Sequence, residues 1–406
     1  MGQIVFVLSR GALGACLIAA LAGCDTLFTG APDDADLLDA PFPELTSEER
    51  AAFTRGDEAF GRAFTPADGL GPIFNDRSCA ACHSGDGRGL PGNILVRIGV
   101  APGFSREIGG PQIQTRAISG AVPEAIPSGV ATSRRLPPPV FGVGLIEAIP
   151  IELIAAREDP DDLDGDGISG RASWIAPPDW VPTDEPGGGT GLQLGRFGRK
   201  AQVTNLLQQV VEAYHQDIGI TTDFLPLENE NPLSGAGTRS ADRIPDPELP
   251  EGEVRAVVEY LRMLAPPAPG EMTPHRVEGA AHFEEVGCAA CHVAELQTGN
   301  HRITALAYRP VPLYSDLLLH DMGEALADNR PDGAADGREW RTAPLWGLRV
   351  MRDFLAGEAY LLHDGRARSV EAAILFHGGE AASSRAAFEA LNTEDRVALL
   401  DFVETR

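Results

Sequence analysis

The chain has 406 residues and a formal net charge of −26, from 59 acidic and 33 basic side chains. Because nucleic-acid phosphates are bound by basic surfaces, this balance argues against a nucleic-acid partner. The length exceeds that of one ordinary hydrophobic core, and the 46 glycines and 32 prolines predict long loops and short helices.

Residues 1–23 are typical of an export signal. Arg10 precedes the apolar run GALGACLIAALAG, which is too short to span a membrane by itself. The run ends in LAGC, and small residues before a cysteine resemble the bacterial lipobox, in which that cysteine, here Cys24, is lipidated. We therefore expect a periplasmic protein that is held on a bacterial membrane by lipid alone, with residues 24–45 as an acidic tether. A plain signal peptide that happens to contain Cys24 is the alternative.

The pentapeptide CAACH occurs twice, at Cys79–His83 and at Cys288–His292. A zinc site needs four ligands, and no second CxxC follows either pair at finger spacing. A dithiol redox pair belongs near a βαβ pattern, whereas the flanks here are glycine-rich and helical. In covalent haem attachment, two cysteines bond the haem and the next histidine binds the iron. The motifs therefore predict two covalently bound haem c groups, held by Cys79, Cys82 and His83 and by Cys288, Cys291 and His292.

An internal repeat accompanies the two motifs. Residues 251–264 and 393–403 carry apolar side chains at helical spacing, as the closing helix of a cytochrome c domain would. The stretches RLPPPVFGVG and GRFGRKA in the first half echo RTAPLWGL and HDGRARS in the second. We predict a mostly α fold of two cytochrome c-like domains, each with one covalent c-type haem, with long Pro/Gly-rich loops. The expected bounds are 46–265 for the N-terminal domain, which contains an insertion, and 275–406 for the C-terminal domain.

Further motifs point to a family. Besides the paired CAACH, the chain contains DGDGISGRA, HDMG, GREWRTAPLWGL, LHDGRARS and FHGGEA. Together they resemble bacterial di-haem cytochrome c peroxidases, and most closely the di-haem oxidoreductase family, over nearly all of residues 45–406. The resemblance implies an enzyme that takes electrons from a small donor protein, such as a cytochrome c or a cupredoxin, and reduces peroxide. A non-enzymatic electron-transfer cytochrome with two six-coordinate irons, serving a respiratory or metal-uptake system, is the alternative.

The resemblance also assigns the sixth ligand of the C-terminal haem iron. In the peroxidases an HDG stretch precedes this ligand, and counting from the HDG at His363 reaches His377. Relatives use Met or Tyr there, so a histidine is a departure. His320 and Met322, in LLLHDMG, are rival ligands, and His377 as an ordinary surface residue is a further alternative.

The N-terminal half has no histidine at the matched place. Its QDIG stretch resembles the EMG stretch that carries the distal acid of the peroxidases, so Asp217 is the candidate catalytic acid, with Glu147 as a second candidate. Such an acid moves a proton between the peroxide oxygens as their bond breaks. If His215 bound the iron instead, this haem would be closed to peroxide.

Related sequences often carry a tryptophan where Arg199 stands, and that aromatic side chain is thought to relay electrons between the haems. Arginine cannot be oxidised for such hopping. Either Phe197 or Trp346 lies nearby, or transfer runs directly between the haem edges.

An acidic loop places Asp162, Asp164 and Asp166 at alternate positions, with Gly167 next. This pattern matches the opening half of a calcium loop. The twelfth position would be Ser173 rather than glutamate, which excludes a complete EF-hand. The sequence predicts a partial calcium loop, with a solvated acidic turn as the alternative.

Overall fold

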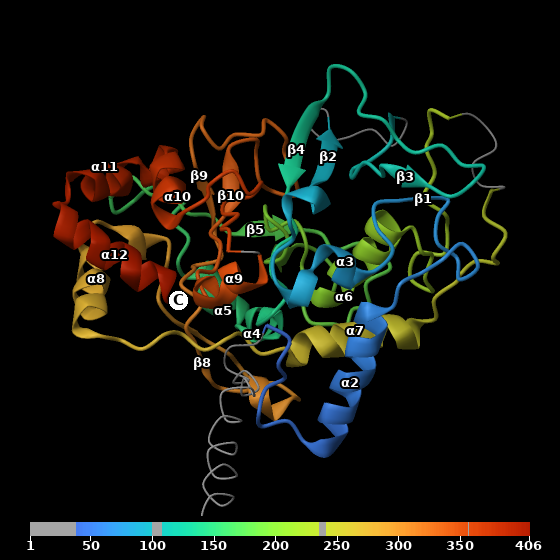
Figure 1. Ribbon diagram of the computed structural model, residues 1–406, viewed down its shortest axis with the longest axis horizontal. Coiled ribbons are helices and arrows are strands. Elements are labelled where there is room, and N and C mark those ends of the chain that lie inside the picture. The colour runs from blue at the N-terminus through green and yellow to red at the C-terminus, as the bar shows by residue number, and fades with distance from the viewer. Residues whose placement is uncertain (1–37, 100–107, 235–240, 356) are drawn as a thin grey trace, which may run out of the picture.

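The computed structural model describes residues 38–99, 108–234, 241–355 and 357–406 (Figure 1). The export signal, Cys24 and most of the predicted tether lie outside the described residues. None of the helices within the described ranges is both long and apolar enough to cross a bilayer.

The protein is rich in helices and carries a few small sheets, which confirms the mostly α expectation at this level. The helices are α2 (Ser47–Gly61), α3 (Cys79–Cys82), α4 (Val143–Ala148), α5 (Ile151–Ala155), α6 (Leu206–Ala213), α7 (Glu251–Met263), α8 (Pro274–Glu285), α9 (Leu348–Phe354), α10 (Val370–Phe376), α11 (Ala382–Ala390) and α12 (Thr393–Glu404). The amphipathic helices predicted over 251–264 and 393–403 are thus confirmed as α7 and α12.

The strands form antiparallel pairs that sequence analysis did not predict. They are β1 (Ile73–Phe74) with β3 (Arg116–Ala117), β2 (Leu95–Gly99) with β4 (Ala131–Arg135), β5 (Ser173–Ile175) with β6 (Gln193–Gly195), β7 (Leu296–Gln297) with β8 (Pro310–Val311), and β9 (Leu319–Asp321) with β10 (Glu339–Arg341). Each strand has two to five residues, so the pairs pin loops together and form no layer of their own.

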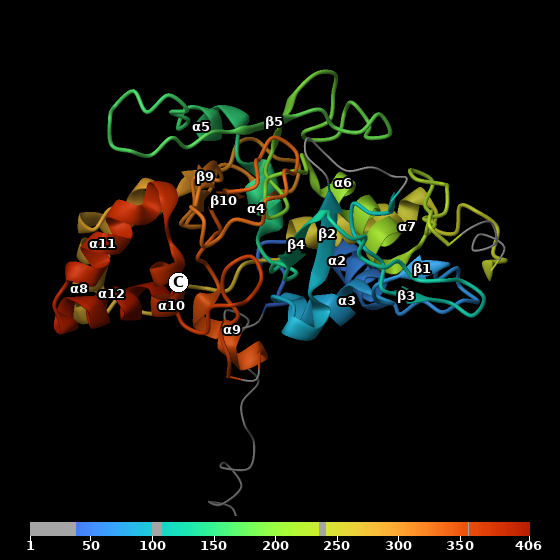
Figure 2. The same cartoon turned by 90° about the horizontal axis from the view of Figure 1, so that it is seen from above.

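Each half of the molecule is built on a close helix crossing that a glycine permits (Figures 1 and 2). In the N-terminal half α2 crosses α7, and a Cβ atom at Gly56 would clash with the carbonyl oxygen of Ala256. In the C-terminal half α8 crosses α12, and a Cβ atom at Gly279 would clash with the carbonyl oxygen of Ala398. Both crossings bring the helix that precedes a CAACH motif against the helix that closes its half.

Two loops far apart in the sequence have the same conformation. Loops 197–203 and 361–367 are each closed by an antiparallel bridge between their first and last residues. In both loops the second and fifth residues adopt positive φ, although only one residue of each pair is glycine. These residues are Gly198 (77°), Ala201 (50°), Leu362 (68°) and Gly365 (76°).

Each of these loops leads into a helix with the same kind of cap. The Asn205 side chain accepts a hydrogen bond from the Gln208 amide at 2.7 Å and begins α6. The Ser369 hydroxyl accepts one from the Ala372 amide at 3.0 Å and begins α10. Loop conformation and N-cap together place α6 and α10 in structural register, so positions can be compared residue by residue between the halves.

The hydrophobic core is continuous through the N-terminal half and into the next segment of the chain. A large cluster of buried side chains includes residues from 38–264 and also from 296–350. A smaller cluster, built on Phe283, Phe388 and Phe402, lies among α8, α11 and α12. The domain bounds expected from the sequence stay a prediction.

Candidate haem-binding site

The N-terminal CAACH motif forms a single helical turn at the edge of a cavity. Ser78 caps α3 by accepting a hydrogen bond from the Ala81 amide at 3.1 Å, and the His83 amide donates to the Cys79 carbonyl at 2.9 Å. Cys79, Cys82 and His83 all line the cavity, and both thiols are free. The turn therefore presents the two sulfurs and the imidazole to one space.

The C-terminal motif repeats this arrangement. The His292 amide donates to the Cys288 carbonyl at 2.9 Å, and Cys288, Cys291 and His292 line a second cavity. The ring of Phe283 lies 6.4 Å from that of His292, and in the first half Phe60 lies 6.2 Å from His83.

Both histidines have the protonation state that an iron ligand needs. Burial lowers the pKa of His83 and of His292 to about 4, so each imidazole is neutral at pH 7. The His292 Nδ1 atom donates to the Tyr314 carbonyl at 2.9 Å, which fixes the ring and leaves Nε2 as the coordinating nitrogen.

His377 faces the same cavity as His292. It caps the end of α10, and its Nδ1 atom donates to the Ala373 carbonyl at 2.7 Å. Burial lowers the pKa of His377, so this imidazole is also neutral, with its Nε2 atom free to bind a metal. The geometry brings together the two histidines that sequence analysis assigned to the C-terminal iron.

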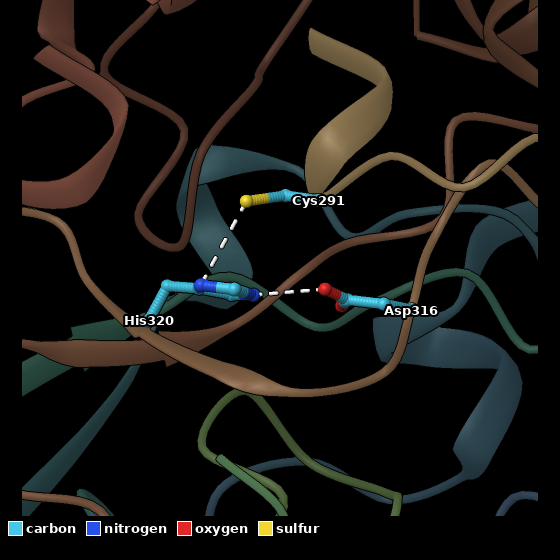
Figure 3. Close-up of side chains that lie close together, drawn as sticks. All are labelled: Cys291, Asp316 and His320. Atoms are coloured by element: carbon cyan, nitrogen blue, oxygen red, sulfur yellow. Dashed lines mark hydrogen bonds and ion pairs between the residues drawn. The ribbon is translucent and has the colours of Figure 1, made fainter. Parts of the chain in front are cut away.

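The rival ligand His320 lines this cavity but both of its ring nitrogens are engaged (Figure 3). Nε2 lies 2.9 Å from Asp316, and Nδ1 lies 2.7 Å from Glu380 and 3.7 Å from the sulfur of Cys291. Burial alone would lower the pKa of His320, but these hydrogen bonds raise it to about 12. An imidazolium has no lone pair for iron, so the geometry favours His377 over His320. Met322 also lines the cavity.

Ala213 occupies in the first half the place that His377 occupies in the second. Ala213 lies as far beyond the N-cap Asn205 as His377 lies beyond the N-cap Ser369. It lines the cavity of His83, and its methyl group cannot bind iron. The histidine missing from the N-terminal half of the sequence is thus replaced by Ala213, as the matched loops and caps show.

Asp217 lines the cavity beside His83, on the π-helical turn Tyr214–Ile218 that follows α6. π-Helical turns are rare and are frequent at functional sites. The Asp217 carboxylate accepts a hydrogen bond from the side chain of Gln112, and burial raises its pKa to about 7. Its backbone carbonyl accepts from the Asn75 amide at 2.7 Å. A carboxyl group that is held in this way can take up or release a proton at neutral pH.

Neither Glu147, the second candidate acid, nor His215, the possible iron ligand, lines this cavity. Glu147 is buried on α4, where its carboxylate lies 2.6 Å from Arg262 and accepts from the Leu206 amide at 2.9 Å. The Nε2 atom of His215 donates to the Leu227 carbonyl at 2.9 Å. The geometry therefore favours Asp217 as the acid, and it places the His215 ring against the Leu227 carbonyl rather than in the cavity.

Both aromatic residues considered beside Arg199, Phe197 and Trp346, line the first cavity. Trp340, to which the sequence assigns no role, lines the second cavity and stacks on His363 with a distance of 3.8 Å between ring centroids. Arg199 itself lines both cavities.

The acidic loop gathers a different set of carboxylates from the one expected. Oxygens of Asp159, Asp162 and Asp164 lie within 4.8 Å of one another, whereas Asp166 is outside this group. The Asp166 carboxylate instead accepts from the Ile168 amide at 2.8 Å. Asp162 and Asp164 are thus brought together as predicted, with Asp159 in the place of Asp166.

The residues present fit a haem in each cavity. Each cavity combines an unbonded pair of cysteines, an adjacent neutral histidine and a lining of mainly apolar side chains. This donor set suits a large apolar macrocycle that carries iron.

A family model described as "Di-haem oxidoreductase, putative peroxidase" matches residues 18–97 and 118–406. No curated protein matches the chain. Among solved structures, hydrazine synthase of Kuenenia stuttgartiensis is similar at 14% identity over 100% of both chains, with a TM-score of 0.40. A MauG-like protein associated with microbial copper homeostasis is similar at 15% identity over 93% of this chain and 94% of that one, with a TM-score of 0.38. Because the family model spans most of the sequence, the chain belongs to the di-haem oxidoreductase family.

Proposed function

We propose that the chain is a periplasmic di-haem c-type oxidoreductase with peroxidase-like activity. Electrons from a small donor protein, such as a cytochrome c or a cupredoxin, enter at the C-terminal haem, and peroxide is reduced at the N-terminal haem. Cys79 and Cys82 attach the first haem and Cys288 and Cys291 the second. Two electrons from the donor and two protons convert one hydrogen peroxide into two waters.

One observation carries this assignment of roles to the two halves. His377 lines the same cavity as His292, and Ala213 lies at the matched place in the cavity of His83. With haem bound, His292 and His377 would both be available to the second iron, whereas Ala213 would offer the first iron no such ligand. An open position is what an oxidant needs in order to bind.

Haem supplies, when it is bound, the iron that binds peroxide and accepts electrons. The chain supplies the proton transfer through Asp217. Because its pKa is raised to about 7 by burial, the carboxyl group is divided between its two protonation states at neutral pH. The amide of Gln112 holds the carboxylate in one orientation, so that the proton is exchanged at a fixed place in the cavity.

An optical and electron paramagnetic resonance spectrum of the half-reduced protein tests the proposal. We expect a high-spin five-coordinate component from the N-terminal haem, which cyanide converts to low spin, and a low-spin component from the C-terminal haem. If both haems stay low-spin in every redox state and bind no cyanide, the protein is an electron-transfer cytochrome instead.

Two further parts of the proposal have their own tests. A Cys24→Ser variant should move from the membrane fraction to the soluble periplasmic fraction, and continued attachment would contradict a lipid anchor. Asp159, Asp162 and Asp164 would bind one calcium ion, so a variant with these three residues changed to Asn should contain one calcium fewer by elemental analysis.

A further inference from the structure

Three arginines line both haem cavities at once. The cavities beside His83 and His292 share one wall, and its cationic residues are Arg88, Arg199 and Arg341. These residues come from distant parts of the sequence: the loop after α3, the loop before α6 and strand β10. A side chain that lines two cavities can contact a ligand in either.

Within the part of the chain that the structure describes, the guanidinium groups of this shared wall donate only to backbone carbonyls. Arg88 donates to the Tyr360 carbonyl at 2.5 Å, and Arg199 donates to the Leu136 carbonyl at 2.8 Å. Arg341 donates to backbone carbonyls at 3.0 and 3.2 Å. Among the described residues none of the three forms an ion pair, and the buried Nε atom of Arg88 has no hydrogen-bond partner. Several N–H donors of each group remain unused.

Several other buried cations near the wall are paired with carboxylates. Asp332 lies 2.7 Å from Arg135 and 2.6 Å from Arg330, and Lys200 lies 2.8 Å from Asp328. Arg196, which lines the first cavity alone, is an exception, since its guanidinium group donates to three backbone carbonyls. The three arginines of the shared wall differ, because no carboxylate among the described residues forms an ion pair with them, although Asp364 attracts Arg199 and Asp316 attracts Arg341.

An uncompensated buried cation is unfavourable. Burial lowers the pKa of Arg199 well below its ordinary value, and the neighbouring charges of Arg88 and Arg341 lower it further. An anion that reaches the wall from the cavities removes this penalty. Haem bound in either cavity would bring such an anion, because haem carries propionate carboxylates.

We propose that Arg88, Arg199 and Arg341 form one cationic wall that binds propionate carboxylates of both haems and sets the reduction potentials of both irons together. The inference rests on the proposed function because it requires a haem in each cavity. Guanidinium groups suit this task, since their planar fork pairs with a carboxylate through two parallel hydrogen bonds. Arg199, at a position where relatives often carry an aromatic relay, thus has an electrostatic role.

A fixed positive charge beside a haem favours the reduced iron, because reduction adds an electron to the group. Removal of one charge from a shared wall therefore lowers the potentials of both haems. Removal of a charge at an exposed position has little effect, because water screens it. Arg134 offers that comparison, since it lies exposed on β4 next to the buried Arg135.

The experiment uses the holoprotein with two attached haems, confirmed by mass. Midpoint potentials are measured by spectroelectrochemical titration, and the propionate bending bands by resonance Raman spectroscopy. We expect Arg199→Gln to reduce the equilibrium constant for reduction of each haem about tenfold, which is about 59 mV for a one-electron couple, and to shift the propionate bands of both. Arg134→Gln leaves both potentials and bands unchanged.

Unchanged potentials in Arg199→Gln, or a shift confined to one haem, would overturn the shared wall. If that variant fails to incorporate both haems, Arg199→Lys decides the question. The lysine keeps the positive charge, so the potentials should stay near those of the wild type while the propionate bands shift. Unshifted bands would contradict a contact between Arg199 and the propionates. Peroxide turnover is measured separately. If the variants show the potential shifts but the wild-type protein shows no peroxide turnover, the proposed function is wrong and the cationic wall still stands.

Discussion

The side-chain amide of Gln112 donates a hydrogen bond to the carboxylate of Asp217 beside the first CAACH motif. Asp217→Asn keeps this side chain's size but removes its exchangeable acid proton. We expect peroxide turnover to fall by about 10²-fold or more, the usual contribution of a positioned acid or base, while both haems stay attached. Steady-state peroxide assays and haem stain of the variant measure the two quantities. Unchanged turnover would exclude the acid role.

Gln112→Leu changes the pH dependence of the same step. The hydrogen bond from Gln112 lowers the pKa of Asp217 and opposes the larger effect of burial, which raises it to about 7. Without that bond the pKa rises further, so the pH at which turnover changes moves upward. Profiles of kcat/KM against pH for the wild type and the variant check the shift, and an unmoved profile would show that another group titrates.

Ala213 and His377 can be exchanged as a test of the two roles. Ala213→His places an imidazole where the second half has one, so we expect the N-terminal haem to become low-spin and to lose cyanide binding and peroxide turnover. His377→Ala should give the reverse at the C-terminal haem, with a new high-spin signal. Leu375→His and Leu375→Ala serve as the controls, because Leu375 is exposed on α10.

His320 gives a pH-dependent contribution to stability. Its pKa of about 12 in the folded chain lies above the ordinary value of 6.5 because Asp316 and Glu380 hold the imidazolium. The stabilisation is therefore complete below the ordinary value and is lost as pH rises towards the folded one. We expect His320→Asn to cost about 3 kcal/mol near neutral pH, as loss of one partner of a buried pair does, and less as the pH is raised.

Thermal unfolding of both proteins at about pH 6 and about pH 9 measures this difference. The double variant His320→Asn, Asp316→Asn should cost less than the sum of the single variants, because the two residues share one interaction. A cost that does not change with pH would mean that His320 is neutral in the folded protein.

Gly279→Ala tests the helix crossing of the C-terminal half. The added methyl group would clash with the Ala398 carbonyl on α12, and overpacking of this kind costs about 1–3 kcal/mol. Gly252→Ala is the control, because this glycine is exposed on α7 with no atom within 4 Å of the added carbon. That change should stabilise by about 0.4–1 kcal/mol. Equal unfolding midpoints for the two variants would contradict the close crossing.

The parts of the site that sequence analysis located are those that lie within continuous segments. Each CAACH turn places its cysteines and histidine by local geometry alone, and α7 and α12 follow from apolar residues at helical spacing. His377 was reached by counting along one loop and one helix. In all these cases the chemistry depends on neighbours in the sequence.

The parts that the sequence did not disclose depend on distant residues. Arg88 contacts the backbone of Tyr360, more than 270 positions away, and no spacing rule links them. His320 was open as an iron ligand until the fold brought Glu380 to its Nδ1 atom. The strands are too short to show an alternating pattern, since pairing with a remote partner defines them.

The matched loops before α6 and α10 have an evolutionary consequence. Ala201 matches Gly365 and Leu362 matches Gly198, and all four residues have positive φ. Two unrelated loops would not easily converge on this shared conformation, because it is unfavourable for Ala201 and Leu362. Duplication of one ancestral haem-carrying unit accounts for it. Under the proposed function, one further difference between the copies, Ala213 in the place of His377, would separate a catalytic iron from a conducting one.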